Sequence, residues 1–549
     1  MLPLALLTAS LALAPQDPAR DADAAFAALV PTDACILVRI ASLDATDAAM
    51  AAIAGASGAP AGEDARTWLA TALQAELPLE LVDPQRPIAI GATLPAGAFE
   101  PTRTYVLPVS DADAFAAALD DTPTQWTAAI WEDYVALSDI DDYAPPVTAS
   151  PLLAGLTSDC FALRVDMQGV MSAYAPMIEL GMQEFRSSFE SELAGEPAAE
   201  LLREVPDFVE EFVDALQRID VELVLDGTAL RFEIDCTLDP DSALGKADDG
   251  EHVFAAELAG RMPPDAAVQF VADYDANWLE PLTELALAEI EKSLRADALA
   301  DLEPATSEGE AMLDALRAVG DQLAQVGRRS AFAFDLGDEG FTATVCLSTS
   351  DPAAMAGAHS KLVATALRLT EEEPEIAIGP SSERGIGGVT FTETSISVEL
   401  ALVESGDSAE VASEKRTDEL LVGTDGLRFA YGSDAGHFLL ALDADDAALA
   451  RLAGAGVAAL DPTLDELAGA SSGFWLRSDL ARIAEINARI AAAEAGNEVG
   501  ASTGASAAVA VWGGVRGSHW FCGISTERTT LDRAFELLES ENGASTAGK

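Results

Sequence analysis

The chain has 549 residues, which is more than one hydrophobic core organises, because single cores stop growing at about 250 to 300 residues. Its formal net charge is −62, from 93 acidic and 31 basic residues, and 49% of its residues are hydrophobic. The apolar content excludes wholesale disorder, and the acidity disfavours nucleic acid and anionic lipid as partners, since both carry the same sign of charge. We expect at least two globular domains, for which weakly held divalent cations are possible partners.

The N-terminus has the pattern of a signal peptide. Residues 1–14 form an apolar stretch that ends in the small residues Ala12 and Ala14, and polar residues follow it. No Lys or Arg precedes the apolar stretch, so an apolar first helix is the alternative. No later stretch reaches the roughly 20 apolar residues of a membrane-spanning helix. We therefore expect an extracytoplasmic protein, periplasmic or secreted, that is not inserted in the membrane after signal cleavage.

The first two predicted modules cover residues 20–150 and 151–250. In the first, the sequence predicts a helix over 21–29, a strand over 35–40, helices over 44–54 and 63–77, strands over 86–91 and 102–109, a helix capped by Asp111, and strand-like residues over 128–138. In the second, it predicts a strand over 160–165, helices over 169–193 and 198–217, a hairpin that turns at Asp226 and Gly227, and a helix that begins near 239–241 or at 252.

The third and fourth modules cover residues 251–460 and 461–549. In the third, we expect a strand over 268–272, helices over 276–294 and 307–326, a hairpin of 330–336 with 341–348, a helix from Asp351, and strands over 389–394, 396–403, 419–422, 427–431 and 438–442, with a mobile loop over 405–417. In the fourth, we expect a strand over 473–477, a helix over 479–495, a hairpin of 507–512 with 520–525, and a helix over 530–538.

The opening strand of each module is a repeated pattern. Three copies align on Arg39, Arg164 and Arg477, and a looser copy has Val271 at this position. Each module's helices need an apolar surface, which one face of an antiparallel sheet supplies. The predicted fold class is α+β, with tandem repeated modules of antiparallel sheet packed by helices, in two pseudo-equivalent halves that divide near residues 245–252.

The repeated arginines are the candidate site residues. In one interpretation Arg39, Arg164 and Arg477 line a groove and bind an anion, since the chain has so few basic residues. In the other, each caps a sheet edge or pairs with a nearby carboxylate such as Asp166 or Asp479. We favour the structural interpretation.

The cysteines favour buried free thiols over a disulfide. Cys35 and Cys160 occupy the same place in two opening strands, whereas Cys236, Cys346 and Cys522 each lie five residues before the acidic residue that starts the next helix. Module 1 has Val106 at the latter position, so we expect a small buried core site. No spacing of Cys and His indicates a metal site.

Catalytic patterns are weak. The G-x-S-x-G pattern occurs at residues 469–473 and 500–504, but both copies precede a strand, whereas a nucleophile elbow follows one. The four histidines are scattered and show no metal-ligand spacing. The aspartate clusters at 139–142, 239–241 and 443–446 have ligands suited to Ca²⁺, but helix caps and turns explain them better. The sequence predicts no catalytic, cofactor-binding or metal-binding residue, and no cofactor.

A resemblance is carried by the Pro-Thr-Asp-Ala lead-in at 31–34, the strand from Arg86 and the strand-to-helix step at 107–115. In these stretches the chain resembles a group of exported bacterial proteins, common in planctomycete-type bacteria, that are labelled as domains of unknown function. The resemblance implies an exported α+β repeat protein without known enzymatic activity. It supplies no functional residue.

Our first functional hypothesis is therefore a non-enzymatic cell-envelope or periplasmic protein that binds a small ligand or an envelope protein. The alternative is an extracytoplasmic hydrolase that uses a pair of carboxylates. An enzyme of that kind holds two carboxyl groups close together in a cleft and perturbs at least one. A structural or binding module instead offers a broad apolar groove or patch with solvated acids around it.

Overall fold

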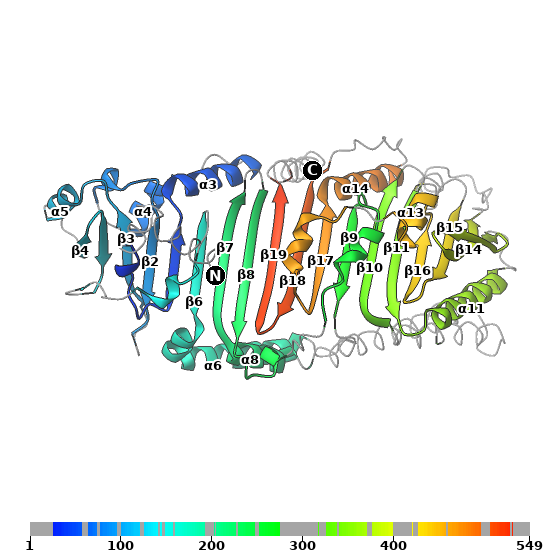
Figure 1. Cartoon of the computed structure of the whole chain (residues 1–549), viewed down its shortest axis with the longest axis horizontal. Coiled ribbons are helices and arrows are strands. Elements are labelled where there is room, and N and C mark those ends of the chain that lie inside the picture. Colours follow the sequence, from blue (N-terminus) through cyan, green and yellow to red (C-terminus); the bar gives the residue numbers. More distant parts are fainter. Residues whose placement is uncertain are drawn as a thin grey trace, which may run out of the picture. The chain divides into compact units, whose positions relative to one another are not determined.

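The computed structural model describes residues 26–57, 64–73, 77–95, 100–120, 126–140, 143–144, 149–156, 160–192, 203, 205–226, 229–246, 252–274, 317, 326–337, 340–370, 376–398, 420, 426–456, 459–495, 506–527 and 530. The chain divides into two compact units. Unit 1 comprises Met1–Arg186 and Phe212–Asp239, and unit 2 comprises Ser187–Glu211 and Pro240–Lys549. Helices combined with extended antiparallel sheet make this an α+β protein (Figure 1). None of the described helices is both long enough and apolar enough to cross a bilayer.

Unit 1 is built on an antiparallel sheet with the strand order β4-β5-β3-β2-β1-β6-β7-β8. The opening strands of the two modules, β1 and β6, are neighbours in it. The strands are β1 (Ile36–Ile40), β2 (Ile88–Thr93), β3 (Thr102–Pro108), β4 (Thr127–Trp131), β5 (Tyr134–Ser138), β6 (Phe161–Asp166), β7 (Leu216–Asp226) and β8 (Ala229–Leu238). The helices are α3 (Leu43–Ser57), α4 (Ala65–Leu73), α5 (Ala112–Asp120) and the 3-10 turns η1 (Leu79–Leu81) and η2 (Pro151–Leu153). Helices α6 (Met167–Glu192) and α8 (Val205–Ala215) contain residues of both units.

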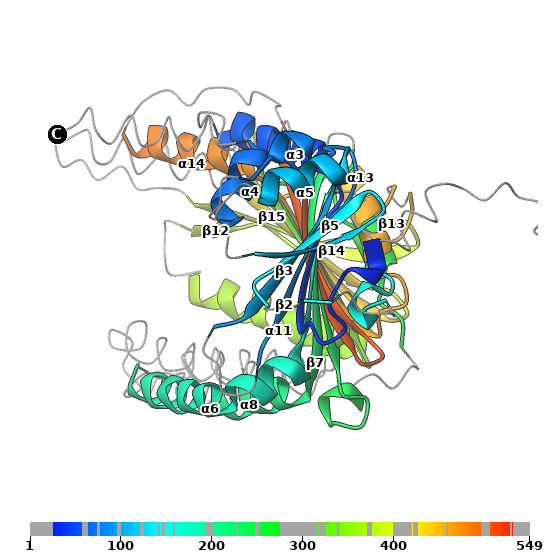
Figure 2. The same ribbon diagram turned by 90° about the vertical axis from the view of Figure 1, so that its left-hand side faces the viewer.

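Both faces of the β1–β5 part of this sheet are buried. Helices α3, α4 and α5 lie together over one face (Figure 2), where Leu69 and Phe115 pack on Ile88 and Leu107. The other face is covered by residues 26–34 and by η2, with Leu29 and Leu152 in the core. Because successive side chains of a strand point to opposite faces, burial on both sides requires continuous apolar runs such as β5, in which every residue is buried.

Unit 2 has an antiparallel sheet with the order β19-β18-β17-β9-β10-β11-β16-β15-β14, and β12 and β13 both pair with the outer side of β14. The opening strands β9 and β17 are neighbours, as β1 and β6 are in unit 1. The strands are β9 (Val268–Asp273), β10 (Val326–Gly337), β11 (Gly340–Thr349), β12 (Ile376–Ile378), β13 (Ser382–Ile386), β14 (Val389–Val398), β15 (Leu427–Ser433), β16 (His437–Leu442), β17 (Ser472–Asp479), β18 (Ala508–Arg516) and β19 (His519–Glu527).

Short helical elements cover one face of the unit 2 sheet and longer helices the other. The main core lies under the 3-10 turns η4 (Ala256–Arg261) and η7 (Pro462–Leu467) and helix α13 (Asp446–Leu452), with Trp475 and Trp512 at its centre. On the other face, α11 (Pro352–Thr370) packs through Met355, and α14 (Leu480–Glu494) contacts Leu336. A further 3-10 turn, η3, spans Leu244–Lys246.

The structure corrects several predicted elements. Residues 128–138 form the hairpin β4–β5 and not one closing strand, because Glu132 adopts a positive φ of 55° at its turn. The helix expected near 239–241 or at 252 is replaced by the 3-10 turns η3 and η4. Strand β10 begins at Val326, where the sequence predicted the end of a helix, and Leu420 is helical where a strand was expected.

Other expectations fall outside the described residues. These are most of the helices over 276–294, 307–326 and 530–538, and the loop over 405–417. The sequence also missed β12, β13 and α13, the last of which borders the pocket described below.

Gly523 in the fourth module packs closely against a tryptophan ring. A Cβ atom there would lie 2.4 Å from Cζ2 of the buried Trp512 ring, so a methyl group forces the ring to shift. We expect Gly523→Ala to destabilise the protein by about 1–3 kcal/mol in denaturant unfolding, the usual result of overpacking. The control is Gly385→Ala in β13, where a Cβ meets nothing within 4 Å and the change should be nearly neutral. Equal stability of the two variants would contradict the tight packing.

Candidate functional site

Arg164 of β6 is buried in a structural ion pair. Its Nε donates to Asp220 Oδ1 at 2.6 Å and its Nη2 to Asp220 Oδ2 at 2.9 Å, while Nη1 donates to the backbone carbonyls of Leu152 and Ala154. The residue is 6% exposed. A guanidinium that is matched to a carboxylate in this two-pronged way binds it strongly and in one geometry. Arg164 therefore fastens η2 to the sheet, with a different acid from the expected Asp166.

Arg477 of β17 occupies the position in unit 2 that Arg164 occupies in unit 1. It lies opposite Gln269 on β9, as Arg164 lies opposite Leu37 on β1. Its Nε is 3.6 Å from Asp461 Oδ2, and its Nη1 donates to the carbonyl of Pro264. Asp461 caps η7, so this arginine also joins a 3-10 turn to an opening strand. The expected carboxylate Asp479 instead caps α14, where it accepts from Arg482 N.

Arg39 and Arg164 lie on the same face of the β1–β6 pair, since Arg39 is paired with Ala162 and Arg164 with Leu37. The positive charges of both arginines also influence the pKa of Glu222 on β7. Burial and the nearby Asp220 carboxylate raise the pKa of Glu222, and the charges of Arg231, Arg164 and Arg39 oppose that rise. The structure thus brings two of the three repeated arginines together in unit 1, whereas Arg477 lies in unit 2. Anion binding by these residues stays a prediction.

The serine and cysteine patterns have structural explanations. Ser471, the central residue of the first G-x-S-x-G match, lies just before β17 and is 4% exposed. Its hydroxyl donates to the carbonyl of Val515. The second match lies outside the described residues. All five thiols are free; Cys35, Cys160 and Cys346 are buried, Cys236 is intermediate and Cys522 is exposed. The expectation of a buried site is therefore wrong for Cys522.

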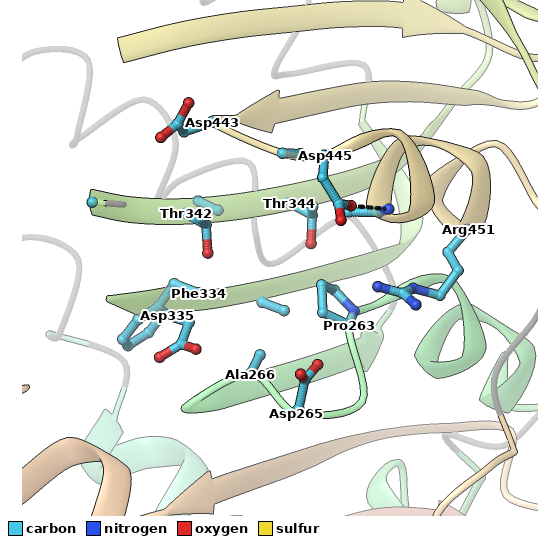
Figure 3. Close-up of a pocket in the computed structure, with 15 residues that line it drawn as sticks. Pro263, Asp265, Ala266, Phe334, Asp335, Thr342, Thr344, Asp443, Asp445 and Arg451 are labelled. Atoms are coloured by element: carbon cyan, nitrogen blue, oxygen red, sulfur yellow. Dashed lines mark hydrogen bonds between the residues drawn. The ribbon is translucent and has the colours of Figure 1, made fainter. Parts of the chain in front are cut away.

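A pocket of about 320 Å³ lies in unit 2, at the end of the sheet where β10 turns into β11. The loop before β9 and the corner between β16 and α13 flank it (Figure 3). Small side chains on the lining leave this space open, because they do not fill the volume between sheet and loops: Ala266, Ala333, Ala343, Ala444 and Ala448. Its polar lining comprises Asp265, Asp335, Thr342, Thr344, Asp443, Asp445 and Arg451.

Three of the four pocket carboxylates have structural partners. Asp335 accepts from Arg482 Nε at 2.9 Å and from Nη2 at 3.2 Å. Asp443, whose φ of 49° lets the chain turn sharply into α13, accepts from Arg428 Nε at 3.1 Å. Asp445 caps α13 by accepting from Ala448 N at 2.7 Å. Among the described residues, no group of three or more His, Cys, Asp or Glu side chains has a geometry that holds a metal ion.

Arg451 is the one basic residue on the lining of this pocket. Figure 3 shows its guanidinium extending from α13 into the space between Asp265 and Asp445. Its Nε is buried, and no acceptor in the described part of the chain reaches it. A buried donor without an acceptor costs about 1–3 kcal/mol. An anionic group in the pocket would pair with this guanidinium.

Sequence reasoning also missed a charged cluster at the start of β16. Arg261 Nη1 donates to Asp434 Oδ2 at 2.8 Å, and His437 Nδ1 lies 2.9 Å from Asp434 Oδ1. Burial alone would raise the pKa of Asp434, but the hydrogen bonds from Arg261, the Gly436 amide and His437 outweigh it and hold this pKa well below its ordinary value. The only available signal was the Asp-x-x-His spacing at 434–437, which lies inside an ordinary hairpin turn.

Comparisons with known proteins add no family. No protein-family model matches the chain, and no curated protein matches it. A solved structure, "Structure of crystal form I of TP0453", matches 51% of this chain and 96% of its own chain, at 10% sequence identity and a TM-score of 0.20. A similarity at this level carries no argument about fold or function.

The Arg164 ion pair is a testable anchor of unit 1. Arg164→Met should destabilise unit 1 by about 3 kcal/mol in denaturant unfolding, because it leaves the buried Asp220 carboxylate without its main partner. The control is Arg103→Met, whose pair with Asp139 spans 3.7 Å on a side chain that is 40% exposed, and whose loss should cost less than about 1 kcal/mol. A loss for Arg164→Met no larger than the control's would refute the anchoring role.

The Asp434 cluster should make unit 2 sensitive to acid. A carboxylate whose folded pKa is depressed stabilises the fold above its unfolded pKa, and that contribution is lost as the pH falls toward the folded pKa. Asp434→Asn should therefore cost about 2 kcal/mol at pH 7. The difference from the parent protein should shrink as the pH falls below the ordinary value of 3.8. Urea unfolding at pH 7, 5, 4 and 3 measures this, and a difference independent of pH would contradict it.

Proposed function

We propose that this is an exported, non-enzymatic protein of the cell envelope or periplasm, whose unit 2 pocket binds a small polar ligand. The observation that carries the proposal is the Arg451 guanidinium, which extends into a cavity of ligand size and has no carboxylate partner among the described residues. Small-molecule sites combine an apolar surround with a few convergent polar groups. Ala266, Ala333 and Ala448 supply the surround, while Arg451 and Thr342 supply polar groups.

The state of the pocket carboxylates supports a binding role over a hydrolase. A carboxylate pair in a hydrolase needs one group free to donate a proton and the other free to attack or to activate water. Asp335 and Asp443 are each committed to an arginine, and Asp445 is committed to a helix cap. Asp265 alone has no partner of this kind among the described contacts, so no two carboxylates of the pocket are both free of structural partners.

We further propose that the two units are pseudo-equivalent halves. In unit 1 the order from β5 to β8 is β5-β3-β2-β1-β6-β7-β8, and in unit 2 the order from β16 to β19 is β16-β11-β10-β9-β17-β18-β19. The two orders match strand for strand. The register of the central strand pair also matches. When the units are aligned on Arg164 and Arg477, the residues opposite them in the sheet, Leu37 and Gln269, occupy equivalent positions. Duplication of a two-module unit explains this correspondence.

Export rests on residues 1–14 and on the acidic, lysine-poor composition. We propose that the signal is removed and that the mature protein resides in the periplasm or is secreted, as in the exported bacterial proteins that the chain resembles. An envelope protein that presents the ligand, or that competes for the same pocket, is a further possible partner.

The binding proposal is tested by thermal-shift screening of the full exported protein. The probes are panels of amino acids, monosaccharides, organic acids and nucleotides. At least one panel member should raise the unfolding temperature, and Arg451→Met should reduce the affinity for it by about 10-fold or more, the value of one lost charged hydrogen bond. The matched control is Arg384→Gln, an exposed arginine that pairs with Asp446 outside the pocket; it should leave binding unchanged.

Two outcomes would contradict this proposal. One is that every panel compound that binds does so equally well to the Arg451→Met protein. The other is recovery of the full-length chain in the cytoplasmic fraction with residues 1–14 still attached, as measured by mass spectrometry.

A further inference from the structure

The charges around the pocket are not balanced. The ion pairs with Arg482 and Arg428 neutralise Asp335 and Asp443, so these residues contribute no net charge. Two carboxylates, those of Asp265 and Asp445, then share the pocket with the single guanidinium of Arg451. The binding space therefore has an excess of one negative charge.

The positions of these charges separate the pocket into two regions. Figure 3 shows the carboxylates of Asp265 and Asp445 directed into the pocket from opposite sides, with the Arg451 guanidinium entering from α13. Asp445 uses Oδ1 to cap the helix, which leaves Oδ2 available. Both aspartates are exposed. The guanidinium suits a carboxylate ligand group, and the two aspartates suit ammonium groups.

The remaining lining suits an aliphatic chain between charged ends. Ala266, Ala333 and Ala448 supply the apolar part of the lining. The hydroxyl groups of Thr342 and Thr344 project from alternate positions of β11 beside it. A cavity of about 320 Å³ holds a molecule of roughly ten heavy atoms together with some water.

From these features we propose that the ligand is a basic α-amino acid, with one carboxylate and two ammonium groups. The carboxylate binds the Arg451 guanidinium. The ammonium groups bind Asp265 and Asp445, and the net charge of +1 on the ligand cancels the excess in the pocket. This inference rests on the proposed binding function and specifies the chemistry of its ligand.

The test compares L-lysine with three analogues by isothermal titration calorimetry on the full exported protein. Cadaverine lacks the carboxylate, 6-aminohexanoate lacks the α-ammonium group and L-norleucine lacks the side-chain ammonium group. Each omission should weaken binding by about 10-fold or more, because each leaves one charged group of the pocket without its partner. L-Ornithine should bind within about 10-fold of lysine, since it keeps all three groups.

Variants assign each charge to its residue. Arg451→Met should weaken L-lysine binding by about 10-fold or more but should not weaken cadaverine binding, because cadaverine has no carboxylate and the guanidinium repels its ammonium groups. Asp265→Asn should weaken lysine more than norleucine. Arg384→Gln is again the matched control and should change neither. Circular dichroism and the unfolding temperature of each variant confirm that it is folded.

The outcomes separate this inference from the proposed function. If norleucine or 6-aminohexanoate binds as tightly as lysine, the inference is wrong. If lysine does not bind but a compound of another class binds in a manner that depends on Arg451, the inference fails and the binding function stands. If no compound of any panel binds through Arg451, both fail.

Discussion

The antiparallel pairing of two opening strands is the constraint on which each unit depends. In unit 1 it joins β1 to β6, and in unit 2 it joins β9 to β17. Its register decides which side chains face which layer, because a slip of one residue would exchange the two faces of a strand. With the observed register, Leu37 and Trp475 enter the cores, and Arg164 and Arg477 meet the 3-10 turns that precede their own strands.

Several of the few basic residues of this acidic chain connect its helical elements to the sheets. Arg164 joins η2 to β6, Arg482 joins α14 to β10, and Arg261 joins η4 to the turn before β16. Each connects a covering element to the sheet through a carboxylate or a carbonyl. Isolated pairs on an exposed surface contribute little, but partly buried pairs with short, two-pronged contacts hold layers in one geometry. Arg451 differs from these arginines, since its contacts leave Nε unsatisfied.

Much of the fold could be predicted from the sequence because its signals are local. The hairpin at Asp226, the Asp111 and Asp351 helix caps, and all four opening strands follow from turn chemistry and periodicity. The hairpin β4–β5 was missed because Glu132 and Asp133 form its turn without glycine or proline. The pocket could not be predicted, since Asp265, Asp335 and Arg451 are far apart in sequence and the β9–β10–β11–β16 pairing, with α13 after β16, brings them together. The repeated arginines drew attention because they recur, whereas no repeated pattern marks Arg451.

The central pair of unit 2 also bears on how fast the protein reaches its native state. Asp273 and Gly473 are neighbours in the sheet, yet about 200 residues separate them, and pairing at such distance must overcome a large loop-closure entropy before it gains contacts. The hairpins β10–β11 and β18–β19 each close over two residues and can form first. We therefore expect the pairing of β9 with β17 to form late, after both flanking hairpins. Until that step the unpaired edges of β9 and β17 can pair with strands of other chains. Repulsion between the strongly acidic copies opposes such aggregation during folding as well as afterwards.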